Sequence, residues 1–130
     1  MKRMKPTAAE LDILRVLWDH GPSTVRFVND ILSEKKEVGY TTTLKIMQIM
    51  LEKGLLSREA VERKHIYTAA ISEKEAQSIM LERILGAAFG GSASQLVMSA
   101  LGNHKTSKEE LKKIRKLIDQ LENGSHGTDA

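Results

Sequence analysis

A thirteen-residue amphipathic stretch followed by two short extended runs constrains the fold of this chain more than any other feature. Residues 41–53 read TTTLKIMQIMLEK and end before Gly54, a residue type that commonly follows a helix. The apolar residues recur at three- and four-residue steps, so they share one helical face: Leu44, Met47, Met50 and Leu51. One extended run begins at residue 55 and a second covers residues 65–69. A polar turn at residues 61–64 lies between them. The pattern predicts a helix and then a two-stranded hairpin.

A helix followed by a basic hairpin is how a winged helix-turn-helix domain ends. Upstream, Thr7-Ala8-Ala9-Glu10 is a capping box that starts a helix ending at Gly21-Pro22, and Ser23 or Thr24 caps a second helix. The expected core residues of these two helices are Leu11, Leu14, Leu17, Trp18, Val25, Val28, Ile31 and Leu32. We therefore predict a winged helix-turn-helix domain over residues 1–72. The alternative is a core helix followed by an ordinary hairpin.

The second half of the chain contains only helical patterns. Capping boxes at residues 72–75 and 107–110, together with Ser92, start three helices between residues 73 and 123. Because these helices carry more apolar surface than about 50 residues can bury alone, we predict a helical dimerisation domain. Its expected interface residues are Ile84, Leu85, Phe89, Leu96, Val97, Leu111, Ile114, Ile118 and Leu121. The alternative is that the helices fold back on their own winged domain. Residues 124–130 are small and polar, which predicts a disordered tail.

The fold class is therefore mainly α with a small β-hairpin wing, and residues that the chain lacks exclude several functions. Without cysteine there is no disulfide and no thiolate metal site, and the four histidines are scattered. Gly90-Gly91 is not a phosphate loop, because no Lys follows it. We predict no catalytic residues, no metal and no cofactor. No apolar run reaches the roughly 18 residues of a spanning helix. The basic start meets Pro6 rather than an apolar run, so we expect a cytoplasmic protein without membrane insertion.

The charge distribution separates the two halves. Residues 1–72 hold 12 Lys+Arg against 9 Asp+Glu, and residues 73–130 hold 8 against 8, so the net charge of +3 lies in the first half. This favours phosphate contact by the first half. The candidate DNA contacts on the 41–53 helix are Thr41, Thr42, Thr43, Lys45, Gln48 and Ile49, and those on the hairpin are Arg58, Arg63 and Lys64. Gln reads adenine, Lys reaches guanine or phosphate, and Ile meets a thymine methyl. One of the threonines is expected to be the N-cap.

Five segments occur in an order that is typical of a known repressor family. They are residues 7–18, residues 21–26, Tyr40-Thr41-Thr42-Thr43, Glu52-Lys53-Gly54-Leu55-Leu56 and Phe89-Gly90-Gly91-Ser92. Together they resemble the BlaI/MecI/CopY (penicillinase repressor) family of transcriptional regulators from about Lys5 to Leu121. The resemblance implies an N-terminal winged helix, a C-terminal dimerisation domain and repression by binding to palindromic operators. Double-stranded operator DNA and a second copy of the chain are then the expected partners.

The resemblance also implies ways of releasing repression. Members that control β-lactamase genes are inactivated when a membrane sensor-protease system leads to cleavage between an Asn and a Phe in the middle helix of the C-terminal domain. At the matching positions this chain has Ser99 and Ala100, so we predict that a penicillin-responsive sensor protease does not cut there. The copper-responsive branch uses a C-terminal cysteine cluster, which this chain lacks.

Two further functions remain open from the residues. The winged-helix domain could serve as a protein-docking adaptor, with the threonine-rich helix facing a protein. A winged repressor could also be released by a small-molecule effector held between wing and tail rather than by proteolysis. Salt dependence separates DNA binding from docking, because binding through several phosphates loses affinity steeply as salt rises.

Overall fold

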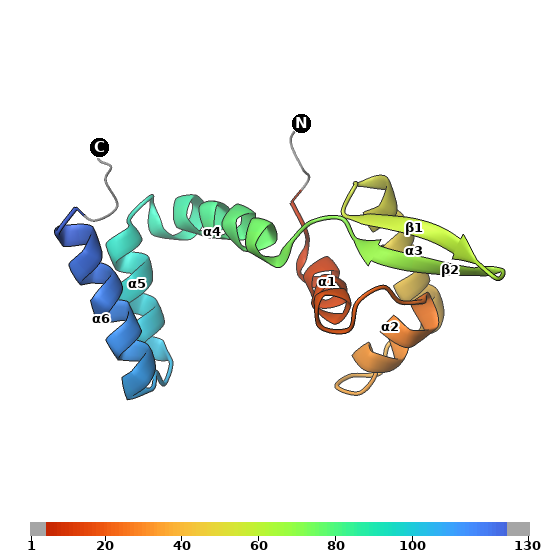
Figure 1. The fold of residues 1–130 in the computed structure, drawn as a ribbon, viewed down its shortest axis with the longest axis horizontal. Helices are drawn as coiled ribbons and strands as arrows, with labels where there is room; N and C mark the ends of the chain where they lie inside the picture. Colours follow the sequence, from red (N-terminus) through yellow and green to blue (C-terminus); the bar gives the residue numbers. More distant parts are fainter. Residues whose placement is uncertain (1–4, 125–130) are drawn as a thin grey trace. The chain divides into compact units, whose positions relative to one another are not determined.

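The computed structural model describes residues 5–124, which form three helices, a hairpin and three more helices (Figure 1). The elements are α1 (Ala8–His20), α2 (Val25–Leu32), α3 (Tyr40–Glu52), β1 (Leu56–Val61), β2 (Lys64–Ala69), α4 (Glu73–Phe89), α5 (Ala93–Asn103) and α6 (Lys108–Glu122). This order confirms the predicted fold class, mainly α with a small antiparallel hairpin. Apart from Gly124, the predicted disordered tail lies outside the described residues.

The helix starts follow the predicted capping residues, with one exception at α3. The Thr7 hydroxyl accepts the Glu10 amide at 3.2 Å, and Glu10 Oε1 accepts the Thr7 amide at 2.9 Å, so the capping box is confirmed. Of the two predicted candidates for the cap of α2, Ser23 and Thr24, it is Thr24 whose hydroxyl accepts a hydrogen bond from the Phe27 amide. The N-cap of α3 is Gly39, which has no side chain to offer, so the prediction that a threonine caps this helix is wrong.

The core of the first unit joins α1, α2, α3 and the hairpin. Its buried apolar side chains are Ile13, Leu14, Val16, Leu17, Val25, Val28, Met47, Met50, Leu55, Leu56, Tyr67, Ile71 and Ala76. Fully burying a large apolar side chain contributes roughly 1.5–3 kcal/mol relative to leaving it exposed. Met47 and Met50 hold the inner face of α3 in this core, so the opposite face of the helix is directed to solvent.

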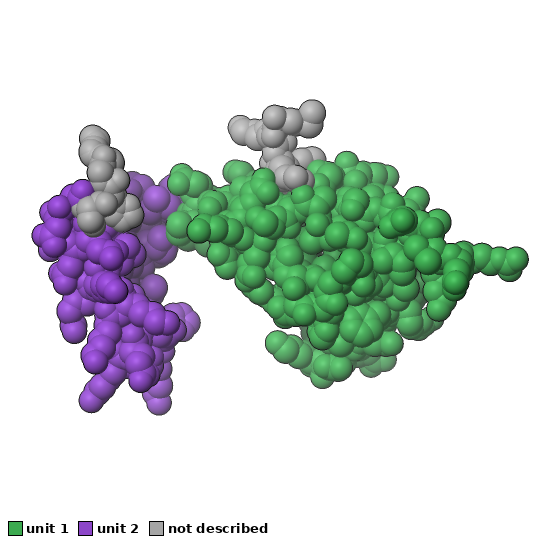
Figure 2. Space-filling model, in the orientation of Figure 1, with its two compact units in different colours: residues 1–84 green, residues 85–130 purple. Residues whose placement is uncertain are grey.

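The chain divides into two compact units inside α4, one ending at Ile84 and the other beginning at Leu85 (Figure 2). The sequence prediction placed a domain boundary earlier, between residues 72 and 73. The first turn of α4 belongs to the first unit because its residues contact α1. Ala76 is buried against the core, and Glu73 forms an ion pair with Arg15 of α1.

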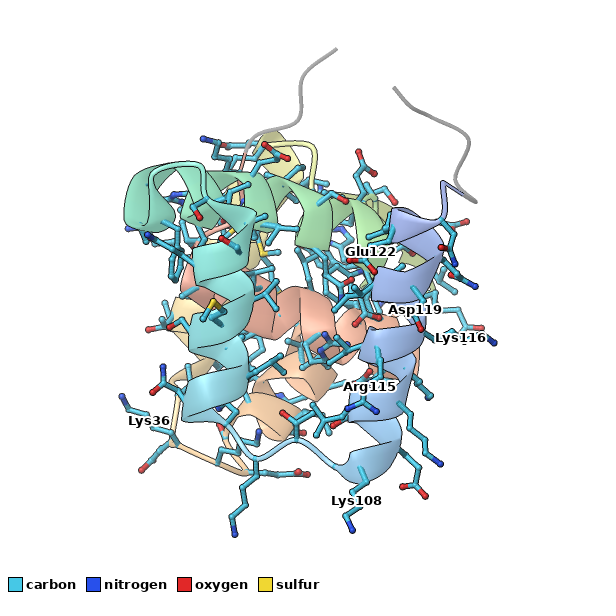
Figure 3. All side chains as sticks on the ribbon, turned by 90° about the vertical axis from the view of Figure 1, so that its left-hand side faces the viewer. Lys36, Lys108, Arg115, Lys116, Asp119 and Glu122 are labelled. Atoms are coloured by element: carbon cyan, nitrogen blue, oxygen red, sulfur yellow. The ribbon has the colours of Figure 1, made fainter. Side chains whose placement is uncertain are left out.

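The second unit leaves its apolar side chains uncovered. None of its described residues is fully buried. Of the predicted interface residues in this unit, Val97, Leu111, Ile118 and Leu121 are exposed, and Leu85, Phe89, Leu96 and Ile114 are partly buried; Ile84, the last residue of the first unit, is also exposed. Met98, at 72% exposure, and Leu117, at 48%, are exposed apolar residues that the sequence analysis did not select. The charged residues Lys108 and Lys116 project away from α6 (Figure 3).

Among the described residues, no single helix is long and apolar enough to cross a membrane. Helices α4 and α5 meet the requirement only when they are counted together across the break between them.

Candidate nucleic-acid interface

The outer face of α3 carries most of the polar residues predicted to contact DNA. Thr41, Thr42, Lys45 and Gln48 are all exposed. Ile49 lies among them with 41% of its surface exposed, although a large apolar side chain gains nothing from water. These five side chains form a surface that can meet base edges in a DNA groove through hydroxyl, ammonium, amide and methyl groups.

Thr43 does not belong to this surface. Its exposure is 0%, and its hydroxyl accepts a hydrogen bond from Asn29 Nδ2 at 2.9 Å. The same Asn29 amide group donates to the carbonyl of Val38 at 2.8 Å. The prediction that Thr43 faces DNA is therefore wrong. The helical period explains this, because Thr43, Met47 and Met50 are spaced by four and three residues and share the buried face.

The amino end of α3 is open to an anion. Because Gly39 is the N-cap and provides no side-chain acceptor, the first-turn amides of the helix have neither a capping side chain nor a helical partner. Free amides and the helix dipole favour negative charge at such a position. The exposed hydroxyls of Thr41 and Thr42 lie in the same first turn and can donate to the same anion.

The wing, which consists of β1, β2 and the turn between them, ends in a two-residue turn. Val61 pairs with Lys64, so Glu62 and Arg63 form the turn, with φ values of 50° and 70°. Two successive positive φ angles are typical of the type I′ hairpin turn, which usually contains Asn or Gly. Arg63 is therefore held at the tip of the wing in a conformation that is unfavourable for an arginine.

A groove of about 480 Å³ joins the wing tip to the amino ends of α2 and α3. It is lined by Thr24, Val25, Arg26, Tyr40, Leu44, Arg63, Lys64, His65 and Tyr67. Three of these side chains are permanent cations, and none of the described lining residues is acidic. The groove thus combines the predicted Arg63 and Lys64 with Arg26 of α2. The third predicted wing residue, Arg58, is exposed on β1 opposite Tyr67 and does not line the groove.

Arg26 and Tyr40 were missed by the sequence analysis. The Arg26 guanidinium lies 4.5 Å from the centre of the Tyr40 ring, which is a cation–π distance. Their position depends on a pairing that no local pattern predicts. The Ser23 amide donates to the Tyr67 carbonyl at 3.0 Å, and the Tyr67 amide donates back to Ser23 at 2.8 Å. This single bridge fastens the start of α2 to β2 and so places Arg26 beside the wing.

The carboxyl end of α3 is anchored to the start of α1. Lys53, the C-cap of α3, donates to Glu10 Oε1 at 2.6 Å, and Glu10 is only 4% exposed. Glu10 therefore caps α1 and also fixes the end of α3. Only the first of these roles could be predicted from the sequence, because the second joins residues 43 positions apart.

An outward-facing helix beside a cationic groove and a two-stranded wing defines this first unit as a winged helix-turn-helix domain of the DNA-binding, transcription-regulator class. The model of the penicillinase repressor family matches residues 6–120, and the chain belongs to this family of transcriptional repressors. The family resemblance and the prediction that the chain is not an enzyme are both confirmed by this match.

Individual relatives are distant in sequence. A penicillinase repressor of Bacillus licheniformis is 24% identical over 115 residues, covering 88% of this chain and 90% of that protein. The transcriptional regulator BlaI of Mycobacterium tuberculosis is 26% identical over 122 residues, covering 89% and 86% of the two chains. Among solved structures, the transcriptional regulator Tm0710 of Thermotoga maritima gives a TM-score of 0.47 at 19% identity, covering 90% of this chain and 74% of that one.

Proposed function

We propose that this repressor acts in the cytoplasm as a homodimer that binds a palindromic operator through α3 and the wing of each subunit. The observation that carries the proposal is the cationic groove of Arg26, Arg63 and Lys64 next to the exposed face of α3. A phosphate strand in that groove would leave α3 directed at the adjacent major groove, which is the docking geometry of a winged helix.

The residues of this surface divide into two roles in the proposal. Lys45, Gln48 and Ile49 lie beyond the first turn of α3 and are proposed to meet base edges. The phosphate contacts are assigned to Thr41 and Thr42 with the first-turn amides of α3, and to Arg26, Tyr40, Arg58, Arg63 and Lys64. Tyr40 can donate its hydroxyl to a phosphate while its ring supports the Arg26 guanidinium.

The homodimer is supported by the uncovered apolar side chains of the second unit. Leu121 is 53% exposed, Ile118 47% and Val97 44%. Large exposed apolar patches mark interaction sites, and two-fold dimers are the commonest soluble oligomers. Two copies that join these faces would carry two α3 helices, which matches the two half-sites of a palindrome.

Release by a penicillin-responsive sensor protease is proposed not to occur at the family's position. Ser99 and Ala100 lie within α5, and the Asn103 side-chain Nδ2 donates to the Ser99 carbonyl at 2.8 Å. A protease pocket shaped for a Phe gains little from Ala. Incubation with an activated sensor system should leave the wild type intact, and Ser99→Asn with Ala100→Phe should create a cut. A cut between Ser99 and Ala100 in the wild type would contradict this.

The salt dependence of operator binding tests the proposed function. An operator is first selected from random duplex DNA, and its affinity is then measured by anisotropy at several salt concentrations. Each phosphate contact should contribute a slope of about −0.9 in log K against log salt. We expect a steep slope and a footprint whose two half-site centres are separated by about one helical turn or a small multiple. Selection of no duplex, or a slope near zero, would favour a protein-docking adaptor instead.

A further inference from the structure

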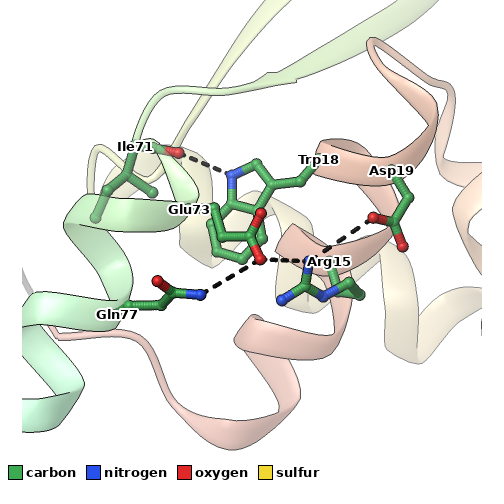
Figure 4. Close-up of polar contacts among 6 residues, drawn as sticks. All are labelled: Arg15, Trp18, Asp19, Ile71, Glu73 and Gln77. Carbon is green, nitrogen blue, oxygen red and sulfur yellow. Dashed lines mark hydrogen bonds and ion pairs between the residues drawn. The ribbon is translucent and has the colours of Figure 1, made fainter. Parts of the chain in front are cut away.

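The first turn of α4 is fastened to α1 by polar contacts that the DNA-binding surface does not use (Figure 4). The Arg15 guanidinium lies 2.7 Å from Glu73 Oε2 and 3.7 Å from Asp19 Oδ1. The Trp18 indole N–H donates to the carbonyl of Ile71 at 3.0 Å. We call Arg15, Trp18, Ile71 and Glu73 the junction cluster.

The chain is buried both just before and just after the point where α4 begins. Ile71, just before the helix, is 2% exposed, and Ala76, in its first turn, is 1% exposed. Between them the Ser72 hydroxyl accepts the Glu75 amide and starts α4. The Arg15 guanidinium also lies 5.2 Å from the Trp18 ring centre, which is a cation–π distance. The side chain that forms the ion pair is therefore next to the one that donates the indole hydrogen bond. The hydrogen bond that Arg15 donates to the Glu73 carboxylate raises the pKa of the Arg15 guanidinium above its ordinary value.

We propose that the junction cluster is a positioning device. It fixes the direction in which α4 leaves the DNA-binding unit and thereby sets the half-site separation that the dimer accepts. The inference rests on the proposed dimeric repressor. Arg15, Trp18 and Glu73 are positioning residues in this account, because they act through α4 and touch no DNA.

The length of α4 makes a small angular error important. The helix has 17 residues, which corresponds to roughly 25 Å at the usual rise. A tilt of about 10° at its first turn displaces its far end by about 4 Å over that length. One base-pair step is about 3.4 Å along the DNA axis, so a loose junction would let the dimer accept a separation that is wrong by one step. A fixed junction discriminates against that separation.

The test uses the full-length protein and a set of duplexes built on its selected operator. One duplex carries the preferred half-site separation, two carry separations one base pair longer or shorter, and one carries a single half-site. The variants are Arg15→Met, Glu73→Gln, their combination and Trp18→Phe. Lys74→Met is the matched control, because it removes a cation next to Glu73 from an exposed residue of the same helical turn.

For Arg15→Met we expect the ratio of affinities for preferred and altered separations to fall about two- to fivefold, as the loss of a partly exposed ion pair allows. Glu73→Gln should lower it by no more than Arg15→Met, because Arg15 then keeps Asp19 and the Trp18 ring. The combination should add nothing to Arg15→Met, because that change already breaks the contact with Glu73. Trp18→Phe should lower the ratio as well. Affinity for the single half-site should stay at the wild-type value in each variant, and Lys74→Met should keep the wild-type ratio.

The contrary results have different meanings. If the variants lower the unfolding temperature but keep the wild-type affinity ratio, the junction cluster only stabilises the fold and the inference is overturned alone. If the wild type binds all separations equally but more tightly than the single half-site, the inference is again overturned alone. If it binds no two-site duplex more tightly than the single half-site, the two-headed repressor itself is overturned, and the inference falls with it.

Discussion

At the scale of a single residue, the Thr43 hydroxyl of α3 is part of the buried core and does not face solvent. Its oxygen accepts a hydrogen bond from the buried Asn29 side chain. Thr43→Val should cost about 1–3 kcal/mol of unfolding free energy, because an Asn29 N–H loses its buried acceptor. Base preference in a selection experiment should not change.

Thr42→Val is the matched control for that prediction. Thr42 is exposed, so the change should alter stability by less than about 0.5 kcal/mol while it weakens operator binding. Denaturant unfolding and binding titrations measure the two effects. A Thr43→Val protein of wild-type stability with altered base preference would show that the hydroxyl does face DNA.

The ion pair between Glu10 and Lys53 gives a second prediction at this scale. Because the pair is largely buried, Glu10→Ala should cost about 3–5 kcal/mol by removing both the ion pair and the capping acceptor. Glu10→Gln keeps an acceptor for the Thr7 amide and should cost less, roughly 1.5–3 kcal/mol. Chemical denaturation measures both, and equal losses for Gln and Ala would mean that the capping role contributes nothing.

At the scale of the elements, the wing tip combines a strained turn with a functional cation. Replacing Glu62-Arg63 by Asn-Gly should stabilise the hairpin by about 1 kcal/mol, because both positions have positive φ. Operator binding should nevertheless weaken for all sequences, and the salt slope should fall by about one. Glu62→Asn separates the two effects, since it suits the turn and keeps the Arg63 cation. An unchanged salt slope would remove Arg63 from the phosphate contacts.

The helices and hairpin could be predicted from the sequence because their signals are local. Capping residues lie three positions from the groups that they satisfy, and apolar spacing reports which face is buried. The same signals misplaced Thr43, because a threonine is neutral on a hydropathy scale and the helix starts at Tyr40. The Arg26–Tyr40 pair and the Glu10–Lys53 pair could not be predicted, because each depends on tertiary contacts between distant segments.

At the scale of the whole molecule, the chain joins a winged helix-turn-helix unit to a second unit whose apolar side chains are uncovered. The cost of separating two subunits follows from effective concentration. When one subunit is bound, a joined partner meets the second half-site as an intramolecular event, which can raise the apparent affinity by a factor of about 10²–10⁴. Dimerisation and operator affinity should therefore be lost together.

The measurement that tests this most directly compares the wild type with Ile118→Glu in sedimentation and in binding to palindromic and single half-site DNA. Ile118 is 47% exposed in the single chain, so the charge should not unfold a subunit. Lys116→Glu, on the side chain that projects from α6, is the matched control (Figure 3). We predict twice 14.5 kDa for the wild type and the control, and 14.5 kDa for Ile118→Glu. The variant should lose about 100-fold or more in affinity for the palindrome and none for the single half-site. A wild type that sediments as a monomer, yet binds the palindrome about 100-fold or more tightly than the single half-site, would contradict the proposed dimer.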